Sequence, residues 1–89
     1  MANPNLRVRI LSPQRLLLDI QADAVSSKNL QGKFDILPLH ANFITVVEDE
    51  PIIIRFKKGK PITFRFPIAL IVTTSNLVNI YTYIQPSPS

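Results

Sequence analysis

One stretch decides the fold: Gly32-Lys33-Phe34-Asp35-Ile36-Leu37-Pro38-Leu39-His40-Ala41-Asn42-Phe43-Ile44-Thr45, which contains one of the two glycines and the only histidine. Gly32 is expected to open a strand, because glycine tolerates positive φ without steric cost. Alternation along that strand places Phe34 and Ile36 on one face and Lys33 and Asp35 on the other. Pro38 has no N–H to give to a ladder and holds the preceding residue extended. The strand should therefore end there, before a bend and a second strand from Phe43.

The composition indicates one small domain. A chain of 89 residues buries about 60–65% of its unfolded surface, and 46% hydrophobic residues are enough for a packed core. The absence of cysteine excludes disulfides and thiolate metal sites. The first residues lack the apolar run of a signal peptide, and the longest apolar run, residues 67–72, is too short to span a bilayer. We therefore expect a soluble or peripheral protein without a transmembrane segment.

Short alternating runs fill the rest of the chain. Leu6, Val8 and Ile10 alternate with arginines, and the trio Ile62, Phe64 and Phe66 alternates with Thr63 and Arg65, so each trio is expected on a buried face. Leu16 to Leu18 are apolar on both faces, which favours a strand between two layers. Lys58-Gly59 is suited to a tight hairpin and Thr74-Ser75-Asn76 to a turn.

These runs predict an all-β fold with no helical periodicity. The spacing favours a flattened β-sandwich or barrel of about eight to ten short, mostly antiparallel strands. We expect this domain to occupy residues 1–84, and the Pro/Ser-rich residues 85–89 to form a disordered tail.

The charge distribution leaves two interpretations open. The net charge of +4 could attract nucleic acid, but only Lys57-Lys58-Gly59-Lys60 forms a basic run, as a solvated hairpin tip would. A small basic β-barrel that binds single-stranded nucleic acid would need exposed aromatic rings beside its basic residues. Phe56, Phe64 and Phe66 share apolar faces with isoleucines, which favours a core role for them and no nucleic-acid partner.

No catalytic, cofactor or metal site is expected. The two glycines are isolated, so the chain lacks a phosphate-binding glycine-rich loop. A nucleophile–base pair could only use His40, and no serine is placed beside it in sequence. The acidic run Glu48-Asp49-Glu50 precedes a proline and has the character of a solvated turn.

The opening stretch resembles the epsilon subunit of F-type ATP synthases, which is called delta in mitochondria. That family carries a Gly-x-Phe/Leu-Gly-Ile-Leu-Pro-x-His-Ala-Pro-Phe segment in its N-terminal sandwich. The matching positions, with no gap, are Gly32, Phe34, Ile36, Leu37, Pro38, His40, Ala41 and Phe43. Two positions depart from the pattern, because Asp35 stands at the second glycine and Asn42 at the proline. A looser similarity runs from Arg7 to Tyr81. The wording of the opening stretch looks closest to that of the epsilon subunit of sodium-linked F-type ATPases.

The resemblance implies a non-catalytic central-stalk subunit of an F-type rotary ATPase that translocates protons or sodium ions. Its partners would be the gamma subunit and the c ring, and its place would be peripheral, on the cytoplasmic face of the membrane. The interface residues implied in this way are Lys33, Asp35, Pro38, His40 and Asn42. Lys33 stands where the family often has a glutamate that faces the polar loops of the ring, so the charge is reversed here. The family's C-terminal helical hairpin has no counterpart in the 89 residues.

Alternatives remain at two levels. His40 could be an interface residue at one end of the sandwich together with Lys33, or a turn histidine that only bonds nearby backbone. The whole domain could also be a free-standing β-sandwich that binds some other protein, which differs from a rotor subunit only in its partner.

Overall fold

A computed structural model describes residues 5–83, in which nine β-strands occur and no helix. The strands are β1 (Leu6–Leu11), β2 (Leu16–Ala22), β3 (Ala24–Asn29), β4 (Gly32–Ile36), β5 (Phe43–Val47), β6 (Pro51–Arg55), β7 (Ile62–Arg65), β8 (Ala69–Thr74) and β9 (Leu77–Thr82). The described residues therefore contain no helix that could span a membrane. The all-β prediction is confirmed; the tail predicted at residues 85–89 lies outside the described residues.

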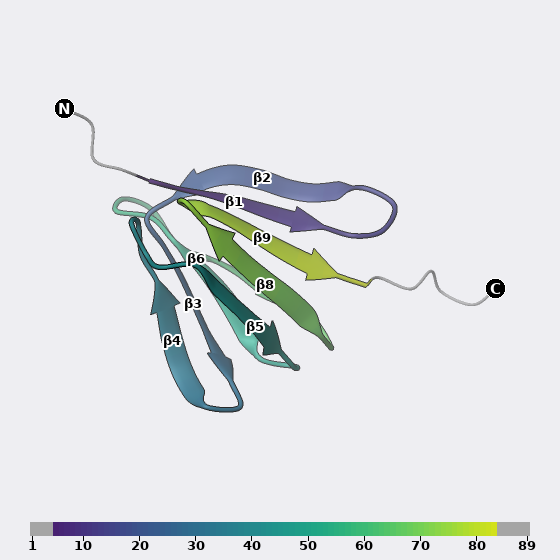
Figure 1. Cartoon of the computed structure of the whole chain (residues 1–89). Helices are drawn as coiled ribbons and strands as arrows, with labels where there is room; N and C mark the ends of the chain where they lie inside the picture. Colours follow the sequence, from purple (N-terminus) through teal and green to yellow (C-terminus); the bar gives the residue numbers. More distant parts are fainter. Residues whose placement is uncertain (1–4, 84–89) are drawn as a thin grey trace.

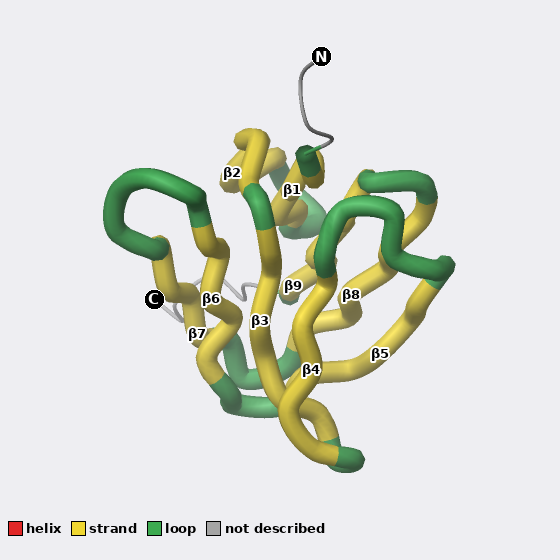
Figure 2. Tube along the Cα trace, turned by 90° about the vertical axis from the view of Figure 1, so that its left-hand side faces the viewer, coloured by secondary structure: helices red, strands yellow, loops and turns green. Residues whose placement is uncertain are grey.

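The strands form two sheets that pack face to face (Figures 1 and 2). One sheet has five strands in the order β2-β1-β9-β8-β5, and the other has four in the order β4-β3-β6-β7. Every pair of neighbours is antiparallel except β1 and β9, which run parallel with Arg7 opposite Leu77. The two sheets stay separate, so the fold is a sandwich and not a closed barrel.

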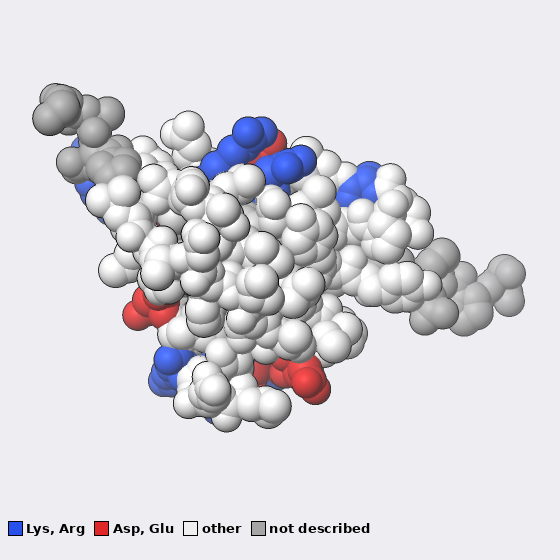
Figure 3. Space-filling model, in the orientation of Figure 1, with Lys and Arg blue, Asp and Glu red and all other residues white. Residues whose placement is uncertain are grey.

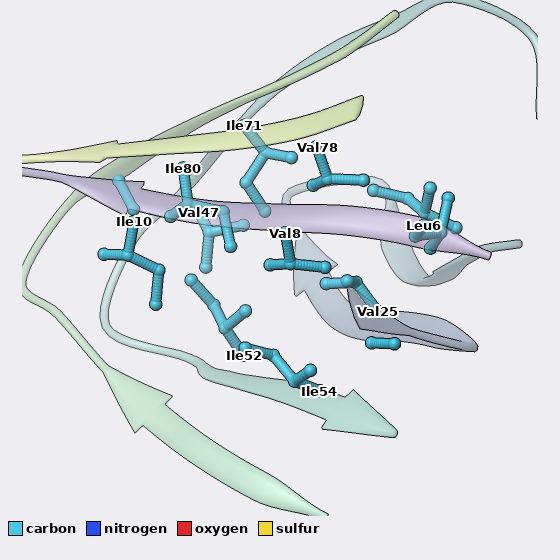
Figure 4. Packing of buried hydrophobic residues seen from close by; sticks show 13 residues of the cluster. Leu6, Val8, Ile10, Val25, Val47, Ile52, Ile54, Ile71, Val78 and Ile80 are labelled. Carbon is cyan, nitrogen blue, oxygen red and sulfur yellow. The ribbon is translucent and has the colours of Figure 1, made fainter. Parts of the chain in front are cut away.

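Alternating side chains from both sheets form the core between them (Figure 4). Leu6, Val8 and Ile10 are fully buried, as their alternation predicts. The other buried apolar side chains come from the remaining strands except β7, and include Val25, Ile36, Val47, Ile52, Ile54, Ile71, Val78 and Ile80. Burying a side chain of this size stabilises the fold by about 1.5–3 kcal/mol. This core fixes the register of the sheets, since a slip of one residue would expose it.

The prediction of a buried Ile62, Phe64 and Phe66 trio is wrong in degree. Ile62 is 39% exposed, and the two phenylalanines are only half-buried. Their inward direction is as predicted, because Ile62 lies opposite Ile54 and Phe64 opposite Ile52. The reason for their exposure is that β7 is the last strand of its sheet, where the facing sheet no longer covers it.

The prediction that Leu16 to Leu18 lie between two layers is also wrong. β2 is the outermost strand of the five-stranded sheet and pairs only with β1 within the described residues. Leu16 is exposed, and Leu17 and Leu18 are half-buried. Apolar residues on both faces of a strand therefore mark an uncovered edge here, not a central position.

The turns follow the sequence signals in most places. Gly32 opens β4 at φ 124°, and β4 ends at Ile36, two residues before Pro38. Ser75 and Asn76 join β8 to β9 with φ values of 48° and 64°, the left-handed pair typical of a two-residue hairpin. Lys58-Gly59 does not make the expected tight hairpin: residues 56–61 form a wider loop between β6 and β7.

Candidate functional site

The loop from Leu37 to Asn42, which joins β4 to β5, is fixed by hydrogen bonds that two of its backbone N–H groups donate. Leu39 has φ 65°, a left-handed conformation that costs an ordinary residue about 1–2 kcal/mol. Its N–H donates to Asn76 Oδ1 of the β8–β9 turn at 2.6 Å, and the His40 N–H donates to the Leu37 carbonyl at 3.1 Å. The bend therefore presents Leu39 to solvent, where it is 79% exposed.

His40 is anchored within this loop. Its Nδ1 lies 2.8 Å from the Ala41 carbonyl, to which the Nδ1–H tautomer donates. The ring packs edge-on against Phe43 at 5.7 Å between centroids, and Phe43 in turn meets Phe34 edge-on at 5.3 Å. These contacts show the local bonding expected of a turn histidine, and the half-buried ring still leaves part of its surface to solvent. Pro38 is likewise half-buried, whereas Asn42 is exposed.

Lys33 and Asp35 lie on the outer face of the four-stranded sheet. Lys33 is directly opposite Lys28 on β3, and neither lysine has an ion pair among the described residues. Asp35 Oδ1 accepts a hydrogen bond from Ser26 Oγ at 2.5 Å, and Ser26 Oγ accepts one from Arg55 Nε at 3.1 Å. This polar row crosses β4, β3 and β6 and lines a shallow hollow of about 430 Å³.

The structure separates the predicted interface residues into two groups. Lys33 follows Gly32 at the β3–β4 turn, and His40 lies in the loop beyond the other end of β4. Figure 2 shows that turn at the bottom of the molecule and the β4–β5 loop at the upper right. The expectation that Lys33 and His40 share one end of the sandwich is therefore wrong. The extended strand β4 runs from Lys33 toward the loop with His40 and separates the two residues along its length.

A wide apolar surface covers the outer face of the five-stranded sheet. We call it the apolar face, and its residues alternate with buried ones on β5, β8 and β9: Ile44, Val46, Leu70, Val72, Leu77 and Tyr81. Ile44 is 70% exposed, although it stands directly opposite Val72 in the ladder. Figure 3 shows the same face uncharged over β9, β8 and β5. Because Ile44 is near the start of β5, directly after the loop that contains His40, this surface lies next to that loop.

Charged residues border the apolar face along β1 and β2. Arg7 donates two hydrogen bonds to Asp19, from Nε at 2.9 Å and from Nη2 at 2.7 Å. The Arg7 hydrogen bond is the main reason why the pKa of Asp19 lies below its ordinary value, and Asp19 in turn raises the pKa of Arg7. Arg9 Nε lies 3.9 Å from the same carboxylate, too far for a hydrogen bond.

The sequence interpretation missed the residues that complete these surfaces. Asn76 bonds Leu39, Ser26 bonds Asp35, and Arg55 in turn bonds Ser26. A signal for the apolar face does exist in the sequence, because β5 and β8 are apolar at successive positions and not only at alternate ones. Within residues 5–83 no three His, Cys, Asp or Glu side chains cluster as a metal site would require.

A family comparison identifies the domain. The β-sandwich domain of the ATP synthase delta/epsilon chain matches residues 5–83, which is the whole described range. The chain belongs to this family. The delta/epsilon assignment agrees with the resemblance of the Gly32–Thr45 stretch, and the sandwich described above is the fold that the family name states.

Solved structures show the same fold at low sequence identity. A chain of the Euglena gracilis mitochondrial ATP synthase, from a structure of OSCP, F1 and the c-ring, superposes with a TM-score of 0.80 at 13% identity, over 91% of this chain and 53% of that chain. A chain of the Tetrahymena thermophila mitochondrial ATP synthase central stalk and c-ring gives a TM-score of 0.72 at 16% identity, over 89% and 63%. This delta/epsilon domain thus spans less than two thirds of either chain. No curated protein sequence matches it significantly.

Proposed function

We propose that this chain is a non-catalytic rotor subunit of an F-type ATP synthase, which joins the gamma subunit to the c ring. Membership of the delta/epsilon family supports this role, and so does the fold shared with chains from one assembly described as OSCP, F1 and c-ring and from another described as central stalk and c-ring. The role is mechanical: the subunit transmits torque between ring and shaft, and so couples ion translocation to ATP synthesis or hydrolysis. In that assembly it would lie peripherally, at the cytoplasmic face of the membrane.

The single observation that carries the proposal is the apolar face. Contiguous exposed apolar surface on a small domain typically marks a protein-binding site. Each large side chain that a partner removes from water contributes about 25 cal/mol per Å² of apolar area. The face is broad, since it crosses three adjacent strands, and we assign it to the gamma subunit, where a permanent contact would bury it.

The loop residues Pro38, His40 and Asn42 extend the gamma contact in this proposal. The loop is bonded to the β8–β9 turn through Leu39 and Asn76 and leads directly into Ile44 of the apolar face. Local anchoring of His40 is compatible with this role, because it fixes the shape of the loop before a partner binds.

Lys33 and Asp35 belong to a second contact in this proposal, with the c ring. Both lie on the four-stranded sheet, and Lys33 lies near the end of β4 that is away from the loop. The unpaired Lys33 and Lys28 offer positive charge, so the ring loop that meets them should be acidic. A charged contact of this kind suits a surface that stays partly hydrated.

The chain has no cysteine, which allows a direct test by single-cysteine crosslinking in the assembled ATPase. Val46→Cys on the apolar face is expected to crosslink to gamma, and Lys33→Cys to subunit c. Thr63→Cys, exposed on the outer face of β7, serves as the matched control and should crosslink to neither. Failure of the tagged wild-type chain to co-purify with gamma and subunit c would refute the proposed function as a whole.

A further inference from the structure

The five-stranded sheet carries more positive than negative charge on its outer face. Its strands contain two arginines, Arg7 and Arg9 on β1, and one aspartate, Asp19 on β2. All three lie on the outer face, since the inward positions of β1 are buried and Asp19 stands opposite Arg9. Figure 3 shows basic and acidic side chains together over β1 and β2, beside the uncharged surface of the other strands. One carboxylate therefore serves two guanidinium groups.

Arg7 takes both oxygens of that carboxylate. It donates to Asp19 Oδ1 at 2.9 Å and to Asp19 Oδ2 at 2.7 Å. A carboxylate can accept further hydrogen bonds, but Arg9 Nε lies 3.9 Å from Oδ2 and forms none with it. Arg7 and Asp19 together are close to neutral, so the charge of Arg9 is left in excess.

Arg9 is the more buried of the two arginines, although it has fewer partners. Its side chain is 31% exposed, whereas that of Arg7 is 61% exposed. The Nε atom of Arg9 is buried, and so is Oδ1 of Asn79, which stands opposite Arg9 on β9; neither atom forms a hydrogen bond among the described residues. Buried polar groups in proteins normally have a partner. The neighbours of Arg9 within the domain thus leave its guanidinium incompletely bonded.

Arg9 belongs to the same cross-strand row as the apolar face. Asn79 is opposite Val72, and Val72 is opposite Ile44, so one row leads from Arg9 to Ile44 across β9, β8 and β5. Neighbouring strands lie about 4.8 Å apart, so the row is roughly 15 Å long, which is less than the width of an ordinary protein interface. A protein that covers the apolar face would therefore also remove Arg9 from water. Removing a charge from water is strongly unfavourable unless an opposite charge pairs with it.

We propose that Arg9 binds the carboxylate of an aspartate or glutamate on the protein that covers the apolar face, and that this charge pair selects the partner. The inference rests on the proposed contact with gamma, and it requires that gamma present an acidic side chain among apolar ones. The planar guanidinium suits a carboxylate, because two parallel N–H groups can donate to its two oxygens. A neutral or basic partner surface would leave Arg9 buried without a counter-charge and would be rejected.

The test compares the binding of purified gamma to the wild-type chain and to Arg9→Met, which removes the charge but keeps a long side chain. If gamma presents a carboxylate, Arg9→Met should bind at least about tenfold more weakly, because that carboxylate is left buried and unpaired. If gamma presents none, the variant avoids the desolvation of the arginine and should bind equally or more tightly. Equal or tighter binding of Arg9→Met therefore overturns the inference.

Three further variants serve as controls. Arg9→Gln is a second uncharged variant, which should show the same loss and decides the test if Arg9→Met fails to fold. Arg9→Lys keeps the charge but not the planar fork, so its affinity should lie between those of wild type and Arg9→Met. Arg65→Met removes an arginine that is bonded to Asp49 on the other sheet, and its affinity should be unchanged. An equal loss in Arg65→Met would assign the effect to net charge and overturn the inference.

The kinetics of binding and the wild-type result complete the test. A buried charge pair acts mainly on the dissociation rate, whereas a charge at the rim acts on the association rate. The loss in Arg9→Met should therefore lie in faster dissociation, and a loss confined to association would overturn the inference. Absence of binding by the wild-type chain refutes the proposed function and this inference with it, whereas wild-type binding with an unaffected Arg9→Met refutes the inference alone.

Discussion

The two outer faces of the sandwich have different chemistry, although each is built from strands that alternate in the same way. On the five-stranded sheet the outward positions of β5, β8 and β9 are mainly apolar, and Ile44 among them is 70% exposed. On the four-stranded sheet the outward positions of β3 and β4 carry Ser26, Lys28, Lys33 and Asp35. The difference teaches that one face is suited to permanent burial and the other to water or to a weak, charged contact.

Ile44→Asp should have the largest effect on this comparison. It would leave an unpaired carboxylate in a dehydrated contact, which costs several kcal/mol. Affinity for the gamma subunit should fall at least about 100-fold, which corresponds to about 2.7 kcal/mol, as measured by titration calorimetry with purified gamma. Thr63→Asp on the other outer face should leave the affinity unchanged. Equal losses in both variants would remove the distinction between the faces.

Phe64→Ala tests where the inner side of the sandwich ceases to be fully covered. A fully buried phenylalanine would lose about 3–5 kcal/mol on truncation to alanine. Because Phe64 is half-buried and stacks in parallel on Phe66 with centroids 6.0 Å apart, we expect a smaller loss of about 1–3 kcal/mol in the free energy of unfolding. Denaturant melts should compare it with Ile71→Ala, a fully buried reference, for which about 2–5 kcal/mol is expected. A larger loss for Phe64 than for Ile71 would show that β7 is covered in solution.

Lys33→Glu should make the domain slightly more stable but weaken its contact with the c ring. The new carboxylate would face Lys28 and replace a like-charge pair by an opposite-charge pair, which adds about 0.2–1 kcal/mol to stability. Binding of the c ring should weaken by up to about tenfold at low salt, and the difference should shrink at high ionic strength. Co-sedimentation with ring-containing membranes measures it. Unchanged ring binding in the variant would place the contact elsewhere.

The Arg7–Asp19 pair at the border of the apolar face should have the smallest effect, and it should depend on pH. Because the pKa of Asp19 is lowered in the folded chain, its contribution to stability is complete above the pKa of the unfolded state, about 3.9. It is lost as the pH falls through the lower folded value. Asp19→Asn should therefore melt slightly below wild type at pH 7, and the difference should close on acidification. A difference that grows toward low pH would have the wrong sign for this pair.

The wording of the Gly32–Thr45 stretch was enough to predict β4, its end before Pro38, the start of β5 and the family. The period of two was enough to assign Leu6, Val8 and Ile10 to the core, since alternation depends only on neighbouring residues. The same period also gave the inward direction of Ile62 and Phe64, but not their exposure, which depends on how far the facing sheet extends.

The tertiary structure alone decided which strands became edges, which outer face stayed apolar, and which residues meet. β1 pairs in parallel with β9, which lies near the other end of the sequence, and Asn76 bonds Leu39. In neither case do the neighbouring residues in sequence predict the partner. The separation of Lys33 from His40 needed no tertiary information, because the predicted strand rises about 3.3 Å per residue and so separates residues that are close in sequence. Local backbone sterics and the alternation of side chains act within a few residues and can therefore be predicted from the sequence. Pairing between strands that are distant in sequence is determined only when the side chains of the whole core pack together.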